Sequence, residues 1–167
     1  MRVKKDKCGY IITHGIAPHF EQLLLEDVSR SPFFALSFDE SLNKSLQRGQ
    51  MDILVRYWEM EKRLAVTRYL TSEFMGYAKA EDIMTSFEQD VTKKFKDTHK
   101  LVHIGSDGSN VNLLFLQNYN DHRSYQELSA LLYLGTCGLH TVHGSLKAGE
   151  KKSEWKVGKT LKAMSGI

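Results

Sequence analysis

Two acids in this sequence follow apolar stretches, where a sheet can present a carboxylate to a cation or a substrate. Residues 33–38 lead into Asp39, and residues 101–106 lead into Asp107. Apolar runs of this length, bounded by turn residues, predict strands that are buried on both faces. A buried strand tolerates a carboxylate at its end, or where the charge is compensated. For Asp39 alone, a turn or helix-capping role is the alternative interpretation.

The chemistry that the two acids could support is the binding of a divalent cation. If the two strands are neighbours, about 4.8 Å apart, Asp39 and Asp107 can bind one ion between them. Two like charges this close need a cation or a proton. Magnesium and manganese fit, because hard ions prefer oxygen ligands. Two such ions would support phosphoryl transfer, and the second ion usually needs a third carboxylate.

Cys137, His140 and His143 form a second candidate group, in the spacing C-x2-H-x2-H. The group supplies three zinc ligands, whereas a structural zinc site has four. The other cysteine, Cys8, is far away in sequence. A packing or hydrogen-bonding role is therefore the favoured interpretation, and a zinc site is the alternative.

The spacing of apolar residues predicts the elements that carry these side chains. The short connection between the second and third strands favours antiparallel pairing. A helix between the third and fourth strands is the crossover that lets the fourth strand lie beside the first and parallel to it. Polar residues 118–125 are predicted to form a loop, and a helix is expected to begin after Cys137. Strands are predicted near 33–39, 51–58, 63–71, 101–106 and 131–135, and helices near 18–29, 80–96 and 111–117.

Composition places the chain among ordinary globular domains. Its 167 residues suit a single domain, and 41% hydrophobic and 26% charged residues are typical of a globular chain. The net charge of +3 permits a polyanionic partner without requiring one. Two cysteines indicate a reducing, intracellular compartment. No apolar run approaches the roughly 18 residues that span a bilayer, so no membrane partner is expected.

The last twenty residues are rich in lysine. A solvated tail is the favoured interpretation of such a run. The alternative is an arm that contacts nucleic-acid phosphates without regard to sequence. The lysines that would make those contacts are Lys151, Lys152, Lys156 and Lys159.

Four motifs, taken in order, resemble those of hAT-superfamily transposases and of animal proteins derived from them. The motifs are SFDES at 37–41, QMDI with VRYW at 50–58, SDGSNVN at 106–112 and TCGLHTVH at 136–143. The resemblance covers about residues 10–147 and implies an α/β, RNase H-like mixed sheet. That sheet has an antiparallel three-strand meander followed by parallel strands, with flanking helices, and it would be incomplete here. Residues 1–30 would then form a lead-in with a helix, 31–147 the RNase H-like core, and 148–167 the lysine-rich tail.

The same resemblance implies roles for single residues. Asp39 and Asp107 match the first two acids of the family's DDE triad, and Cys137 and His140 match its C-x2-H pair. The family's third acid is a glutamate that follows a long helical insertion, and this chain reaches Ile167 before such a residue. Its late acids, Glu150 and Glu154, lie outside the expected context. Cys8 has no nearby partner for the BED zinc finger that often precedes the core, and Ser109 replaces a frequent proline.

These observations predict a catalytically inactive, transposase-derived domain that binds nucleic acid or protein. The expected partners are DNA, bound without sequence preference, and a protein or a second copy of the chain. The expected location is the nucleus, and magnesium or manganese is the expected cofactor if the site is intact. The alternative is part of a metal-dependent DDE nuclease or strand-transferase that a further segment or another subunit completes.

Overall fold

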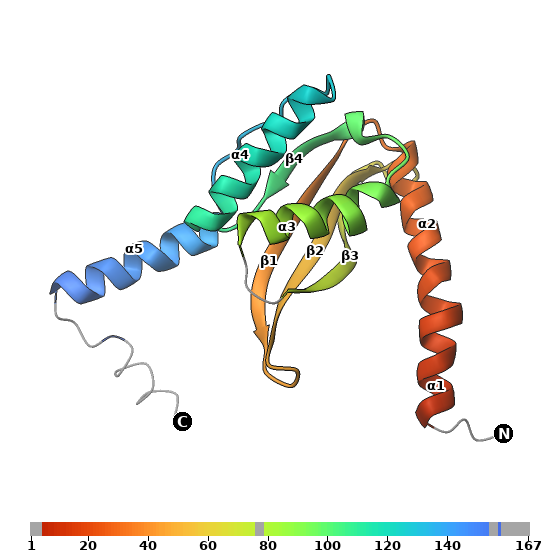
Figure 1. Cartoon of the computed structure of the whole chain (residues 1–167), viewed down its shortest axis with the longest axis horizontal. Coiled ribbons are helices and arrows are strands. Elements are labelled where there is room, and N and C mark those ends of the chain that lie inside the picture. Colours follow the sequence, from red (N-terminus) through yellow and green to blue (C-terminus); the bar gives the residue numbers. More distant parts are fainter. Residues whose placement is uncertain (1–4, 76–78, 154–156, 158–167) are drawn as a thin grey trace.

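The computed structural model describes residues 5–75, 79–153 and 157 of the chain, and it shows a mixed α/β fold (Figure 1). The strands are β1 (Phe34–Asn43), β2 (Arg48–Glu59), β3 (Leu64–Met75) and β4 (Leu101–Gly105). The helical elements are α1 (Lys5–Ile11), η1 (Ile12–Ile16), α2 (Ala17–Arg30), α3 (Ala80–Ser86), η2 (Phe87–Val91), η3 (Thr92–Lys94), η4 (Thr98–Lys100), α4 (Asn110–Tyr125) and α5 (Gly138–Ser153).

The four strands form one mixed sheet in the order β3-β2-β1-β4. β1 pairs with β2 and β2 pairs with β3 in antiparallel fashion, whereas β4 is parallel to β1. The predicted meander and the predicted parallel fourth strand are both confirmed. This arrangement is compatible with an incomplete RNase H-like fold.

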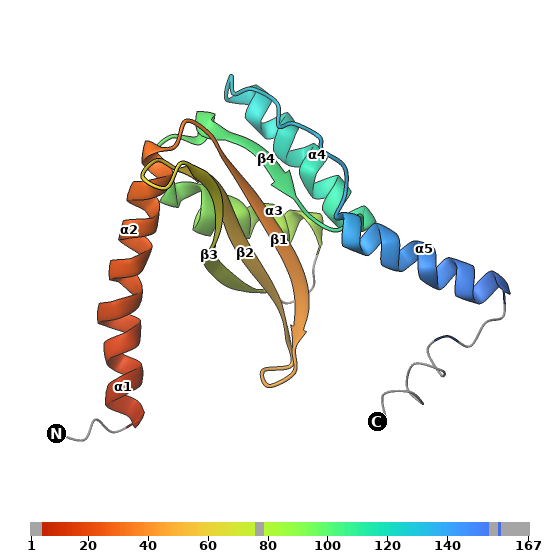
Figure 2. The same ribbon diagram turned by 180° about the vertical axis from the view of Figure 1, so that it is seen from behind.

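Helices cover one face of the sheet, and the core lies between them and the strands. Phe38 of β1 meets Phe87 and Phe115 with ring centroids 6.1 and 5.6 Å away. α3 crosses in front of the strands in Figure 1 and behind them in the reverse view of Figure 2. On the opposite face, Trp58 and Tyr69 are exposed. The alternation of buried and exposed residues along β1 and β2 follows from this one-sided packing.

The C-terminal end of α2 is joined to the β2–β3 hairpin. Ser31 is fully buried, and its hydroxyl donates to the carbonyl oxygen of Phe33 (2.6 Å) and accepts the backbone N–H of Trp58 (3.1 Å). These two hydrogen bonds fix where the chain enters β1.

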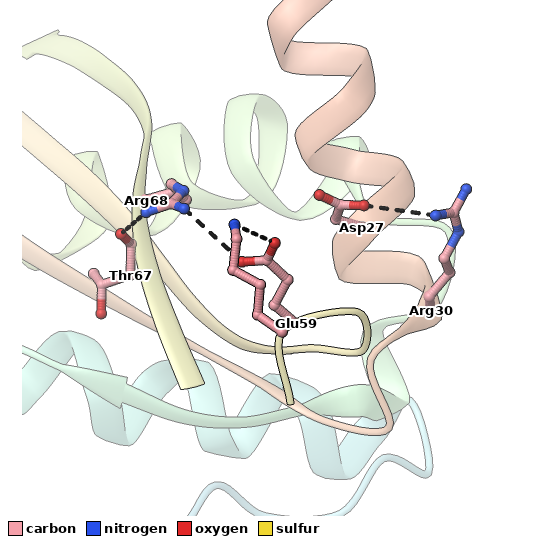
Figure 3. Close-up of polar contacts among 6 residues, drawn as sticks. Asp27, Arg30, Glu59, Thr67 and Arg68 are labelled. Atoms are coloured by element: carbon pink, nitrogen blue, oxygen red, sulfur yellow. Dashed lines mark hydrogen bonds and ion pairs between the residues drawn. The ribbon is translucent and has the colours of Figure 1, made fainter. Parts of the chain in front are cut away.

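Charged pairs surround the same end of the sheet. Glu59 pairs with Lys62 (2.6 Å) and with Arg68 (3.9 Å) across the β2–β3 hairpin (Figure 3). Figure 3 also shows the Asp27–Arg30 pair on α2 (3.7 Å). Each of the three pairs includes a side chain that is at least half exposed, so we expect them to add little stability.

The N-terminal helix is longer than predicted. The apolar spacing predicted a helix over 18–29, but α1, η1 and α2 form one long rod from Lys5 to Arg30 (Figures 1 and 2). The part before Ala17 is exposed, with Ile12 and Ile16 about half exposed.

In the described part of the chain, no helix combines the length and the apolar character needed to cross a membrane.

Residues 131–135 are not a strand, so the predicted fifth strand is wrong. The segment nevertheless runs beside β4 in the same direction, because Leu132 N–H donates to Val102 (2.8 Å) and Cys137 N–H donates to Ser106 (3.1 Å). The ladder is interrupted for two reasons. The carbonyl oxygen of Leu132 is hydrogen-bonded to Nδ1 of His103 (2.8 Å), and Gly135 adopts a φ of +89°.

The predicted loop over 118–125 is also wrong, because α4 continues to Tyr125. Phe115, Tyr119 and Arg123 recur at every fourth position and are buried, as on one face of a helix. The guanidinium of Arg123 donates to the carbonyl oxygen of Ser129 and to two others that precede or begin β4. The buried arginine and the exposed polar residues around it hid the helical periodicity.

Candidate functional site

The first and fourth strands bring the two predicted acids to one end of the sheet. The parallel register pairs Ser37 with Gly105, so Asp39 and Asp107 lie two residues beyond that pair on neighbouring chain segments. Asp39 is exposed and Asp107 is partly buried. The prediction that the fourth strand lies beside the first and parallel to it is confirmed.

One detail of that prediction needs correction. The first strand was predicted to end at Asp39, but β1 continues to Asn43. Beyond the residues that pair with β4, β1 pairs with β2 alone, and this register places Asp39 opposite Asp52. Asp39 therefore lies inside β1, at the point where the pairing with β4 has stopped.

Asp107 is held at the beginning of α4 by the turn that follows it. Its Oδ1 accepts the backbone N–H of Ser109 (3.1 Å) and Nδ2–H of Asn112 (2.7 Å). Ser109 also caps the helix, since its hydroxyl accepts the backbone N–H of Asn112 (3.3 Å). Burial acts to raise the pKa of Asp107, but the hydrogen bonds from Ser109 and Asn112 outweigh it and lower the pKa below its ordinary value.

Glu40 is a third acid at this end of the sheet, and the sequence interpretation did not single it out. It is partly buried and shares the core face of β1 with Phe38. Burial raises the pKa of Glu40 first, and the charge of Asp107 raises it further. A hydrogen bond from Asn112 opposes both effects, and Asp39 adds a smaller increase.

The alternation of side chains along β1 is the signal that could have identified Glu40. Asp39 belongs to the open face of the sheet, whereas Glu40 belongs to the face on which α4 packs. Asn112 could have been found by its position in the first turn of the helix after Asp107. Its side chain donates to Asp107 (2.7 Å), and it also acts to lower the pKa of Glu40.

Cys137 and His140 lie close to this group of acids. Cys137 is tied to the end of β4 by its N–H bond to Ser106 (3.1 Å). Hydrogen bonds from the backbone and then the side chain of His140 lower the pKa of Cys137. The bond to Cys137 raises the pKa of His140 against the effect of desolvation, and the charges of Asp39 and Asp107 raise it further. The predicted C-x2-H pair and the two predicted acids therefore share one neighbourhood.

The zinc alternative finds no support in the arrangement of these side chains. Over the described residues, no group of three or more His, Cys, Asp and Glu side chains is placed to hold a metal ion. His143 is exposed on α5 and does not complete a set with Cys137 and His140.

The two predicted phosphate-contacting lysines that the structure describes lie away from the acids. Lys151 and Lys152 are exposed in the last turn of α5, which extends away from the sheet (Figures 1 and 2). Glu150 belongs to the same distal part of α5. Lys156 and Lys159 lie outside the described residues, as does Glu154.

A sizeable cavity lies elsewhere in the molecule. It measures about 610 Å³ and lies between α2 and residues 94–100, with Leu25, Phe34 and Phe95 among its lining residues. None of the acids at the ends of β1 and β4 lines it. No family model matches this chain, and a search of curated proteins gave no match either.

Proposed function

We propose that this chain is the RNase H-like part of a protein derived from a hAT-superfamily transposase, and that in isolation it binds nucleic acid without cutting it. One observation carries the proposal. Asp39 and Asp107, which match the family's first two acids, lie just beyond the paired residues of neighbouring parallel strands. The motif order and the strand order β3-β2-β1-β4 support the same ancestry.

In this proposal Asp39 and Asp107 hold one magnesium or manganese ion. Such an ion, when bound, polarises a phosphoryl oxygen and lowers the pKa of water. The bonds from Ser109 and Asn112 keep Asp107 ionised at the beginning of α4, ready to bind a cation. A second ion would need a further carboxylate to anchor it, so we expect no cleavage by this chain alone.

Nucleic acid would be contacted through phosphates and a protein partner through α5. Lys151 and Lys152 are exposed cations on that helix, and phosphate contacts of this kind carry little sequence preference. The same helix exposes Leu139, Val142 and Leu146, which favours an additional protein partner or a second copy of the chain. A nucleic-acid-binding role is consistent with a location in the nucleus.

The second candidate is part of a DDE nuclease or strand-transferase that another segment or subunit completes. The electrostatic surroundings of the two acids favour this second candidate. The pKa of Asp107 is lowered, and His140 lies near both Asp39 and Asp107, as in a site whose charges are still arranged around a reaction centre.

A cleavage assay separates the two candidates. The purified 167-residue chain is incubated with labelled duplex DNA and manganese, beside the double variant Asp39→Ala, Asp107→Ala. We expect salt-sensitive binding by both proteins and cleavage by neither. Nicking or strand transfer by the parent and not by the variant would establish the second candidate. Absence of binding even at low salt would contradict the proposed function.

A matched pair of variants tests the lysines. Lys151→Ala with Lys152→Ala is expected to reduce the salt dependence of binding by about one unit of slope for each phosphate that is no longer neutralised. Lys44→Ala with Lys79→Ala removes the same charge from exposed positions elsewhere on the chain. It should change binding less, and equal effects from the two pairs would reject α5 as the contact surface.

A further inference from the structure

The N-terminal rod of α1, η1 and α2 carries a row of exposed apolar side chains. Ile12, Ile16, Phe20 and Leu23 are 44–63% exposed, whereas Val28, on the side of α2 that packs on the core, is buried. In both Figure 1 and Figure 2 the rod is the outermost element on its side, and α1 extends clear of the sheet. A row of exposed apolar residues along one helix indicates a contact surface.

The row is symmetric about Ile16. Gly9 and Ile12 lie seven and four residues before Ile16, and Phe20 and Leu23 lie four and seven residues after it. Steps of three and four residues keep side chains on one face of a helix. η1 is a π-helical turn, in which residues four to five apart lie one above another, so Ile12 and Ile16 stay on that face. A symmetric row suits an antiparallel pair of identical helices, because apolar positions then meet apolar positions.

The sizes of the side chains also match in such a pair. With Ile16 at the two-fold axis, Ile12 lies opposite Phe20 of the second copy, and Gly9 lies opposite Leu23 of the second copy. A Cβ at Gly9 would meet no described atom within 4 Å beyond its own helix backbone. Gly9 therefore leaves room for a large side chain from a second chain, as close helix packing requires.

Charge favours the antiparallel orientation over the parallel one. α1 begins with two lysines around Asp6, whereas residues 21–27 contain Glu21, Glu26 and Asp27 and no lysine or arginine. Antiparallel packing brings the basic end of each rod beside the acidic part of the other, whereas parallel packing would bring the acids together. The helix dipoles favour the same orientation, because each helix N-terminus then lies beside the other helix's C-terminus.

We propose that two copies of this chain form a symmetric dimer in which their N-terminal rods pack antiparallel, centred on Ile16. The overlap of residues 5–27 is about 35 Å long. The two sheets lie at opposite ends of the pair, so neither sheet obstructs the contact. This interface goes beyond the proposed function, because it involves neither the acids at the sheet end nor α5.

The first test is sedimentation equilibrium of the full chain, whose monomer has a mass of 19.1 kDa. We expect the parent to sediment with twice that mass at micromolar concentrations. Ile16→Asp places two like charges across the two-fold axis and should weaken the dimer by at least about a hundredfold. Because Ile16 lies outside the core, the variant should melt like the parent at a concentration where both are monomers.

Ile11→Asp is the matched control. Ile11 is exposed to a similar extent, and it lies about 100° around the helix from Ile12, outside the apolar row. This variant should dimerise like the parent. A parent that is monomeric at these concentrations, or equal effects of the two substitutions, would overturn the inference.

The orientation is tested by spin labels on the exposed Cys8 in the variant Cys137→Ser, which leaves one label on each chain. Cys8 lies eight residues before Ile16, so an antiparallel pair separates the two labelled backbones by about 24 Å along the rods. Double electron–electron resonance should report a distance of that order. A parallel pair would bring the labelled backbones within about 10 Å and broaden the continuous-wave spectrum, which would contradict the inference.

A variant on α5 distinguishes this inference from the proposed function. Leu146→Asp changes the exposed apolar side of α5 and should leave the rod-mediated dimer intact. A dimer that is lost with Leu146→Asp and kept with Ile16→Asp would overturn the inference and leave α5 as the contact surface. Loss with Ile16→Asp alone supports the inference whether or not the chain binds nucleic acid.

Discussion

Asp39 and Glu40 are neighbours in the sequence but belong to opposite faces of β1. The motif comparison directed attention to Asp39 because it matches a family acid, and the prediction that it lies near Asp107 is consistent with the strand pairing. The motif comparison gave no reason to choose Glu40. Buried residues alternate along β1 as far as Phe38. Continuing this alternation places Glu40 on the face of the sheet that the helices cover. The hydrogen bonds of Asn112 depend on a turn whose geometry the sequence does not specify.

The environment of Glu40 predicts a pH-dependent effect on stability. Its pKa is raised above the ordinary value of 4.5 by burial and then by the charge of Asp107. The folded state therefore holds the proton more tightly than the unfolded state, so the contribution of Glu40 is greatest below that ordinary value. It is lost as the pH rises through the raised pKa. Glu40→Gln avoids this loss and should melt at a higher temperature than the parent near neutral pH in metal-free buffer.

Thermal melts of the parent and Glu40→Gln at about pH 4 and about pH 7 check the sign. We expect the difference in melting temperature to be small in acid and to favour the variant at neutral pH. The pKa of Asp107 is lowered, so its contribution is present above about 3.8 and is lost only in acid stronger than the range compared. A variant that melts lower than the parent at neutral pH would identify Glu40 as a required hydrogen-bond acceptor.

At the scale of elements, α4 shows where sequence periodicity fails. Its first half was predicted from Val111 to Gln117, but its second half was assigned to a loop because it is polar. The helix continues because Tyr119 and Arg123 are buried beneath that polar surface. The prediction of a strand over residues 131–135 was wrong for the opposite reason. Its residues are apolar, but a side chain from β4 takes a carbonyl oxygen that a strand ladder would use.

We expect the replacement of Arg123 to cause a large loss of stability. The residue is 2% exposed, and its guanidinium bonds to the carbonyl oxygens of Ser129 (2.9 Å), Thr98 (3.2 Å) and Leu101 (3.2 Å). Arg123→Ala removes these three hydrogen bonds and should cost about 2–4 kcal/mol in the free energy of unfolding. Arg123→Lys keeps the charge but lacks the planar spread of donors that reaches three separate carbonyls, so it should recover only part of the loss.

Urea unfolding followed by circular dichroism measures these changes. A matched control is Arg56→Ala, since Arg56 is exposed and donates to the Thr67 hydroxyl (3.1 Å). That variant should stay within about 0.5 kcal/mol of the parent. If Arg123→Ala were as mild as the control, the arginine would not be what joins α4 to the beginning of β4.

At the scale of the whole molecule, the sheet order and the existence of the flanking helices were predictable, but the length of the N-terminal rod and the position of α5 were not. A short connection, a crossover helix and period-two patterns are enough to order β1 to β4. The long N-terminal rod and α5 expose apolar side chains such as Phe20 and Leu139, so their positions do not follow from burial in the core. The positions of such helices depend on contacts other than those with the sheet. The pattern of apolar residues in the strands does not predict these contacts.

We propose above that acids of β1 and of the turn between β4 and α4 bind one cation. The most direct measurement is the paramagnetic broadening of backbone amide resonances when a trace of Mn²⁺ is added to the isotopically labelled full chain. We expect the resonances of residues 39–40 and 107–112 to broaden first. They should recover when excess Mg²⁺ competes for the site. Broadening that begins instead at other exposed acids, such as Glu81 and Asp82 of α3, with the strand ends unaffected, would contradict it.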